Sequence, residues 1–135
     1  MKRHAKLISL SRQHHQQLLL ARLMRLDAPL YKGLPTIVEE KVSYAIQFFH
    51  EHLIDHFSSE ERLFDSLKSY TLQTETLALI KKQKEYQDQL KASFLSLTVA
   101  SLDQTGRLME DAVRHEERIL FQHLQQNYSL EDGSY

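Results

Sequence analysis

Two residues that can bind metals stand four positions apart in the segment HFSSEERLF, residues 56–64. Residues at positions i and i+4 of an α-helix project from the same side of adjacent turns. The imidazole of His56 and the carboxylate of Glu60 would therefore face one direction and offer a nitrogen and an oxygen donor to a metal ion. The alternative is an inert pair in which the two side chains satisfy each other.

Further polar residues interrupt the apolar stripes of the chain. They are His14 or its neighbour His15, Gln83 and Glu116. A buried carboxylate is costly unless it finds a cation, hydrogen-bond donors or a proton. Facing helices that carry imidazoles and carboxylates can surround a metal ion. Because the chain has no cysteine, nitrogen and oxygen would hold any such ion, and these donors suit iron, manganese or zinc.

Each of these residues also has an interpretation without metal. His14 and His15 would be an inert pair at a seam between helices, and Gln83 fits a buried hydrogen-bonding residue better than a ligand. Glu116 lies in RHEER, which could be a solvated run of charges. The other histidines are expected at the surface or the rim of the bundle: His4, His50, His52, His115 and His123.

Apolar residues recur at steps of three and four in four segments, which predicts four amphipathic helices. We expect these helices at about residues 9–27, 36–68, 72–97 and 101–126. Thr36 with Glu39, and Ser101 with Gln104, fit capping boxes that would begin the second and the fourth helix.

Four such helices joined by short connections predict an all-α fold, an antiparallel four-helix bundle with up-down-up-down topology. The bundle would occupy residues 1–128, and residues 129–135 would form a short C-terminal tail. The segment DAPLYKGLP, which holds both prolines, is the clearest loop.

The composition excludes several classes of protein. A formal net charge of -1 argues against a nucleic-acid binder, which normally carries a basic surplus. No apolar run approaches the length of a membrane span, and the opening MKRHAKLISLSRQHH lacks the apolar core of a signal peptide. We therefore expect a cytoplasmic protein with neither nucleic acid nor a membrane as its partner.

The chain resembles the hemerythrin-like, or HHE cation-binding, family over nearly its whole length. The resemblance rests on LSRQHH, HFSSEERLF, IKKQKEYQDQL and AVRHEERILF, which follow the family order H, HxxxE, H and HxxxE. It implies a hemerythrin-like bundle with a non-heme iron centre of one or two ions. It also implies a protein that senses or handles oxygen, nitric oxide or iron. The metal ligands it implies are His14 or His15, His56, Glu60, Glu116 and Gln83.

The chain departs from the family pattern at two positions, where Gln83 and Ala112 replace histidines. Glutamine is a weak oxygen donor and alanine offers no donor. The remaining residues could hold one ion, or two with bridging carboxylates or solvent. Further donors could come from residues near the matched positions: His115 beside Glu116, His52 one turn before His56, His123 two turns beyond Glu116, and Glu117.

The second hypothesis is a degenerate, metal-free bundle that acts as an interaction or structural module. Its partner would be another protein or a second copy of the chain. It predicts a core closed by hydrogen bonds among His56, Glu60, Gln83 and Glu116, with a water or a protonated carboxyl group between them.

Overall fold

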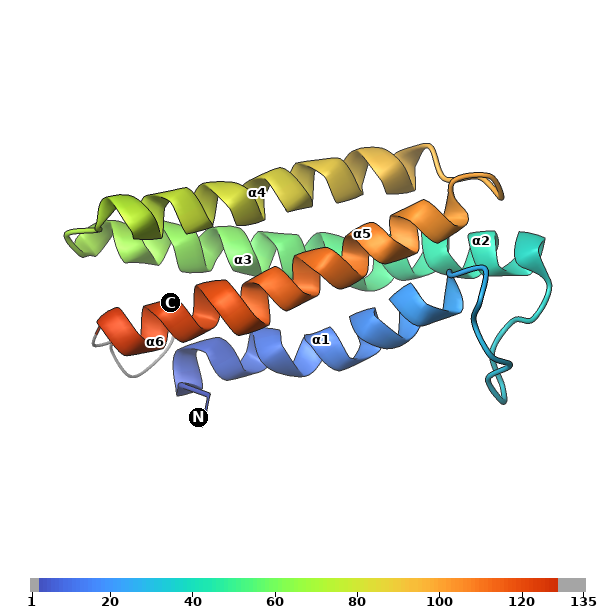
Figure 1. The fold of residues 1–135 in the computed structure, drawn as a ribbon, viewed down its shortest axis with the longest axis horizontal. Coiled ribbons are helices and arrows are strands. Elements are labelled where there is room, and N and C mark those ends of the chain that lie inside the picture. Colours follow the sequence, from blue (N-terminus) through green and yellow to red (C-terminus); the bar gives the residue numbers. More distant parts are fainter. Residues whose placement is uncertain (1–2, 129–135) are drawn as a thin grey trace.

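The computed structural model describes residues 3–128, and every regular element in that range is a helix. Four long helical stretches lie alongside one another (Figure 1). The first stretch is α1 (Ala5–Leu23), and the third is α4 (Thr74–Leu95). The second stretch consists of α2 (Val38–Phe48), a π-helical segment (Phe49–Leu53), α3 (Ile54–Ser66) and a 3-10 turn (Leu67–Ser69). The fourth consists of α5 (Leu102–Arg114), a second π-helical segment (His115–Leu120) and α6 (Phe121–Asn127). The prediction of an all-helical fold with four long helices is confirmed.

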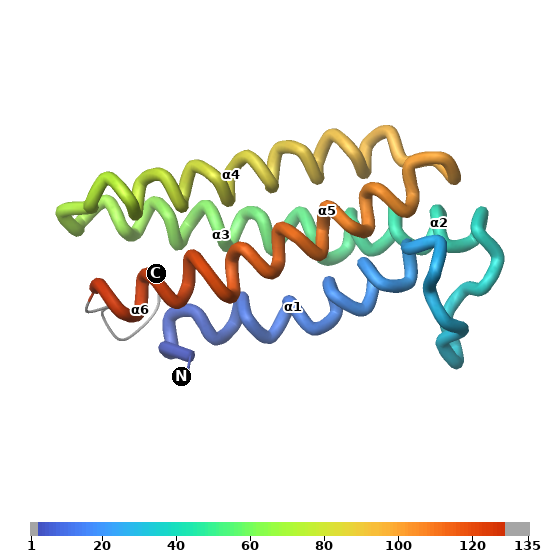
Figure 2. The backbone as a smooth tube through the Cα atoms, viewed as in Figure 1, coloured from blue at the N-terminus to red at the C-terminus, as the bar shows by residue number. Residues whose placement is uncertain are grey.

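The first helix begins and ends earlier than the sequence predicts. It starts at Ala5, because the ring nitrogen Nδ1 of His4 accepts a hydrogen bond of 2.9 Å from the backbone N–H of Lys6 and so caps the helix. It ends at Leu23 instead of continuing to residue 27. Figure 2 shows the long connection to α2, residues 24–37, at one end of the molecule.

Both predicted capping boxes are wrong. Helix α2 begins at Val38 after Ile37, which has no capping side chain. Ser101 does precede α5, but its side chain makes no capping bond. The hydroxyl of Ser101 instead accepts a hydrogen bond of 3.0 Å from the backbone N–H of Thr98, within the turn before the helix.

The interior has an apolar cluster at each end and a polar layer between them. One cluster gathers residues such as Leu20, Ala45, Phe94 and Val113, and the other gathers Leu10, Leu63, Leu120 and Phe121. On each long helix, buried polar residues fall between members of the two clusters: His14 on α1, His56 and Glu60 on α3, Gln83 and Gln87 on α4, and Glu116 on the last helix. The fold thus places these side chains at one level of the core.

Helices α1 and α5 lie close together at Gly106. A Cβ atom at this position would lie 2.7 Å from the backbone oxygen of Ala21 and 2.8 Å from Cβ of Met24. Only glycine permits this approach without a shift of the backbone. The contact fixes the spacing between α1, which carries His14, and α5, which leads into the π-helical segment that carries Glu116.

No helix among residues 3–128 is both long enough and apolar enough to cross a membrane.

Candidate metal centre

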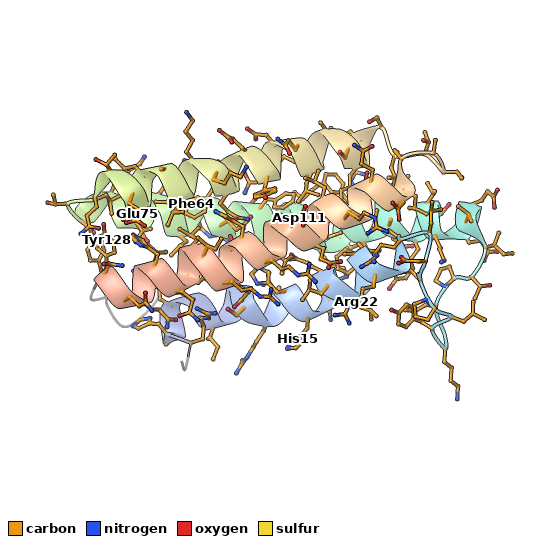
Figure 3. The ribbon with its side chains drawn as sticks, in the orientation of Figure 1. His15, Arg22, Phe64, Glu75, Asp111 and Tyr128 are labelled. Atoms are coloured by element: carbon orange, nitrogen blue, oxygen red, sulfur yellow. The ribbon has the colours of Figure 1, made fainter. Side chains whose placement is uncertain are left out.

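His14 reaches the polar layer from α1 and is only 3% exposed. Its Nε2 lies 2.7 Å from Oε1 of Glu116, and its Nδ1 lies 2.7 Å from Oε1 of Glu117. His15 is exposed on the outer side of α1 (Figure 3). Of the two histidines between which the sequence could not choose, the structure brings His14 to the other candidate ligands and leaves His15 outside.

His56 enters the same layer from α3 and is also 3% exposed. Its Nε2 lies 3.6 Å from Oε2 of Glu60 and 3.6 Å from Oε1 of Glu116. The Nδ1 of His56 lies 2.6 Å from Oε1 of Gln13 on α1. Since an amide oxygen can only accept, Nδ1 carries a proton and donates it to Gln13.

The two buried carboxylates complete the inner face of the centre. Glu60 is 2% exposed and Glu116 is fully buried. Oε1 of Glu60 accepts a hydrogen bond of 3.1 Å from Nε2 of Gln87. Oε2 of Glu116 has no hydrogen-bond partner among the described residues. An unsatisfied carboxylate oxygen in the core is costly and indicates a missing cation, donor or water.

The inner atoms are spaced as the ligands of one ion would be. Ligand atoms of His14, His56 and Glu116 all lie within 4.8 Å of one another. Two donors that bind one ion at about 2.1 Å lie about 3.0–3.4 Å apart in tetrahedral or octahedral geometry. The separations of 2.7 and 3.6 Å at Glu116 bracket this range, so small side-chain movements would suffice.

The outer atoms of the same side chains are held by other residues. Gln13 holds Nδ1 of His56, Glu117 holds Nδ1 of His14, and Gln87 holds Oε1 of Glu60. Glu117 is itself fixed by Arg3, whose Nη2 lies 2.6 Å from Oε2. Such partners orient metal ligands and set the tautomer of each imidazole.

Sequence reasoning missed Gln13 and Gln87 and gave Glu117 no such role. One signal was available: Gln87 follows Gln83 by four residues and so belongs to the same helical stripe. The roles of Gln13 and Glu117 depend on contacts between helices, which no spacing within one segment reveals.

The cluster surrounds a small internal cavity of about 10 Å³. This space suits a single water molecule or ion. The polar atoms of His14, His56, Glu60 and Glu116 line one part of it, and apolar residues such as Met109 and Val113 line another. The centre is therefore shielded from bulk water.

Gln83 and Ala112 also line the cavity, but neither offers it a free donor. The Oε1 of Gln83 accepts a hydrogen bond of 2.7 Å from Nδ1 of His115, and its Nε2 donates one of 3.2 Å to the backbone oxygen of Ala112. Gln83 thus behaves as the buried hydrogen-bonding residue that its type suggests.

The expectation that the remaining histidines lie at the surface or rim is wrong for two of them. His115 is 8% exposed and His123 is 9% exposed. His115 bonds Gln83, and Nε2 of His123 lies 2.6 Å from the hydroxyl of Thr76, away from the centre. His50 and His52 are exposed, as expected.

Both histidines of the centre favour the protonated form in the ion-free protein. Burial lowers the pKa of His56, but hydrogen bonds to Glu116 and Glu60 outweigh it and raise the pKa from 6.5 to about 10. Burial likewise opposes protonation of His14, yet its bonds to Glu116 and Glu117 raise its pKa. Two imidazolium groups then supply the positive charge that a metal ion would otherwise bring.

The two buried carboxyl groups shift in opposite directions. Burial, together with the charge of Glu116, raises the pKa of Glu60 to about 8. Burial also disfavours the charged form of Glu116, but the hydrogen bond with His14 and the nearby side chains of Glu60 and His56 outweigh it and lower the pKa of Glu116. Near neutral pH, Glu116 is therefore the anion of the centre and Glu60 carries a proton.

Comparison of the chain with protein-family models, with curated proteins and with solved structures gives no match.

Proposed function

We propose that this chain is a hemerythrin-like metal-binding protein with up-down-up-down topology, which holds one iron ion between His14, His56, Glu60 and Glu116. In this proposal the protein senses or handles oxygen, nitric oxide or iron in the cytoplasm.

The observation that carries the proposal is that the outer atoms of the ligand side chains are hydrogen-bonded to other residues, whereas their inner atoms converge on one point. Gln13, Glu117 and Gln87 occupy the outer atoms, while the inner nitrogens and oxygens converge and Oε2 of Glu116 lacks a partner. In a core that binds no ligand, a buried carboxylate oxygen normally has a hydrogen-bond partner. A cation at this point would satisfy it.

The size and lining of the cavity support one ion rather than two. Two metal ions in a shared site lie about 3.5–4 Å apart, which exceeds the room in a cavity of about 10 Å³. Donors for a second ion would have to come from positions 83 and 112. The amide oxygen and nitrogen of Gln83 are already hydrogen-bonded, and Ala112 has no donor atom in its side chain.

The donor set supports iron. Two imidazoles and one carboxylate with open positions are typical of non-heme iron(II) sites, and the proposed set adds a second carboxylate, Glu60, to these three donors. Iron held in this way supplies an open position for a small diatomic molecule. The chain's own part is to orient the donors, to exclude bulk water through the apolar lining, and to give up the imidazole protons when the ion binds.

Elemental analysis tests the proposal. Protein purified without chelators is loaded with Fe²⁺ under anaerobic conditions and freed of excess metal. We expect about one ion per chain in the wild type and in His15→Ala, and a large loss of metal in His56→Ala. Substoichiometric iron, manganese and zinc in the wild type after loading, with no thermal stabilisation, would contradict the proposal.

One observation favours the second candidate, a metal-free interaction or structural module. Protonated His14 and His56 can balance the charges of Glu116 and Glu117 without an ion, Glu60 is neutral when protonated, and the amide of Gln83 is bonded to His115 and Ala112. The same elemental analysis separates the two candidates.

A further inference from the structure

A second cavity, of about 200 Å³, lies beside the metal centre and opens between α1 and the second long helix. We call this cavity the vestibule. Its walls include Gln13, Gln17, Glu51, His52, Asp55 and His56. Glu51 and His52 come from the π-helical segment Phe49–Leu53, and Asp55 and His56 come from α3.

The vestibule and the central cavity share two walls, Gln17 and His56. Gln17 is 5% exposed; no hydrogen bond joins its side-chain amide to another described residue, and because neither amide atom is among the buried atoms left without a partner, the amide reaches solvent. Gln17 therefore offers a free oxygen and a free N–H at the boundary between the two cavities.

The charges of the vestibule favour a cation. Glu51 and Asp55 contribute two carboxylates, and neither lysine nor arginine lines the cavity. One oxygen of Glu51 accepts a hydrogen bond from Gln47, and Asp55 has no ion pair among the described residues. His56 at the inner end is protonated in the ion-free protein, so the negative charge lies at the exposed residues Glu51 and Asp55, which raise the local concentration of cations and their rate of association.

Gln13 lies between the vestibule and the metal centre. Its exposed side chain lines the vestibule, and its Oε1 accepts the Nδ1 proton of His56 at 2.6 Å. The bond holds the imidazole with Nε2 directed inward and places an amide across the outer edge of the ring. An exposed glutamine can change rotamer rapidly, so this contact can open without any movement of the helices.

We propose that the vestibule is the route by which a hydrated divalent cation enters the bundle. Glu51 and Asp55 attract the cation, and Gln13 closes the inner end of the vestibule. Gln17 provides an oxygen donor at the boundary with the central cavity. This inference rests on the proposed function for the identity of the cargo. The claim that the vestibule gives access to His56 stands on the two cavities alone.

The charge of the vestibule is tested by the rate of metal uptake. Co²⁺ is mixed with ion-free protein, and its absorption is followed in a stopped-flow instrument. Glu51→Gln with Asp55→Asn should slow association about three- to tenfold at low ionic strength, and the difference should vanish at high salt. The matched control, Glu85→Gln with Asp88→Asn, removes the same charge from exposed positions of α4 and should match the wild type. Equal rates in the two double variants would overturn the proposal.

The role of Gln13 is tested without any metal. Deuterium exchange at the carbon between the ring nitrogens of His56 reports solvent access to the imidazole, and mass spectrometry follows it for each histidine. Gln13→Ala should speed this exchange several-fold, whereas Gln16→Ala, at another wall of the vestibule, should leave it unchanged. An unchanged rate in Gln13→Ala would overturn the gate.

The two tests also separate this inference from the proposed function. Wild-type protein that takes up no Co²⁺ contradicts the proposed function and, with it, the cation as cargo. The exchange rate of His56 then decides the claim of access by itself.

Discussion

Glu116 is the residue on which the centre depends. It is the only one of the four proposed ligands that contacts both histidines, and its Oε2 is left without a partner among the described residues. It is also the anion that holds the two imidazolium groups in the ion-free protein, since its lowered pKa keeps it charged. Of the two histidines, its neighbour Glu117 contacts only His14, at the outer nitrogen.

Glu116→Gln should therefore weaken metal binding more than Glu117→Gln does. Loss of a partner behind a ligand costs about 10–100-fold in metal affinity, and we expect that range for Glu117→Gln. For Glu116→Gln, which removes a ligand and its charge, we expect a loss of more than about 100-fold. Titration of both variants with Fe²⁺ or Zn²⁺ measures the difference. Equal losses would show that the ion does not lie between the helices as proposed.

The raised pKa values predict that the ion-free protein loses stability in alkali. The stabilising contribution of His56 is complete below its unfolded pKa of about 6.5 and is lost as the pH rises to about 10. Glu60 keeps its proton in the folded state up to about pH 8, so its contribution is complete below about pH 4.5 and is lost as the pH rises through 8.

Glu60→Gln tests this origin of the pH dependence, because glutamine stays neutral at every pH. Denaturant unfolding should show a free energy of unfolding that falls between about pH 6 and pH 9 in the wild type. In Glu60→Gln the free energy of unfolding should decrease less with pH. The difference should be up to about 1.4 kcal/mol for each pH unit between the unfolded and the folded pKa of Glu60. Glu61→Gln, at the next position, is the control. Parallel curves for the wild type and Glu60→Gln would contradict the account.

At the scale of the helices, the π-helical segment His115–Leu120 explains why sequence reasoning misplaced His115. In a regular α-helix, neighbouring residues point about 100° apart, so a stripe drawn through Glu116 leaves His115 outside. The segment His115–Leu120 is π-helical, and its wider turn brings His115 and Glu116 inward together. Single π turns within α-helices frequently occur at functional sites, but apolar spacing does not reveal them.

Deletion of Ile119 tests the role of this turn. Ile119 is 48% exposed, and removing one residue from a π turn lets the chain close as α-helix without rotating its flanks. We expect a folded, helical protein in which Glu116 and Glu117 no longer both face His14, with metal affinity reduced by more than about tenfold. Circular dichroism controls for folding. Wild-type affinity in a folded deletion variant would show that the π turn is not needed.

Gly106 tests the spacing between α1 and α5. Because a Cβ here would overlap the backbone of Ala21, Gly106→Ala should push the helices apart and cost about 1–3 kcal/mol of stability. Metal affinity should fall as well, since His14 lies on α1 and Glu116 lies in the π-helical segment that continues α5. Denaturant unfolding and metal titration measure both effects. A more stable variant would contradict the close approach.

At the scale of the whole molecule, the sequence predicts the class of fold better than it predicts the centre. Apolar repeats identify four long helices and place His14, His56, Glu60, Gln83 and Glu116 on inward faces, where the structure has them. The repeats record only which side of a helix is buried. They do not decide which of His14 and His15 is buried, because either of two adjacent residues near the edge of an apolar stripe can point into the core.

The residues that support the centre could not be predicted, because they depend on the packing of different helices. Gln13 on α1 meets His56 on α3, and Gln87 on α4 meets Glu60 on α3. The polar layer also lies between two apolar clusters, which only the assembled bundle shows. This layer is the part of the molecule where stability and metal binding should be coupled.

The central claim, one ion bound between His14, His56, Glu60 and Glu116, is tested most directly by thermal unfolding at increasing concentrations of Fe²⁺ under anaerobic conditions. A ligand that binds only the folded state stabilises it by about 2.7 kcal/mol at 100 times its Kd. We predict a rise in Tm of several degrees in the wild type and in His15→Ala, and none in Glu116→Gln. A Tm that does not respond to Fe²⁺, Mn²⁺ or Zn²⁺ in the wild type, or that responds equally in Glu116→Gln, would contradict the claim.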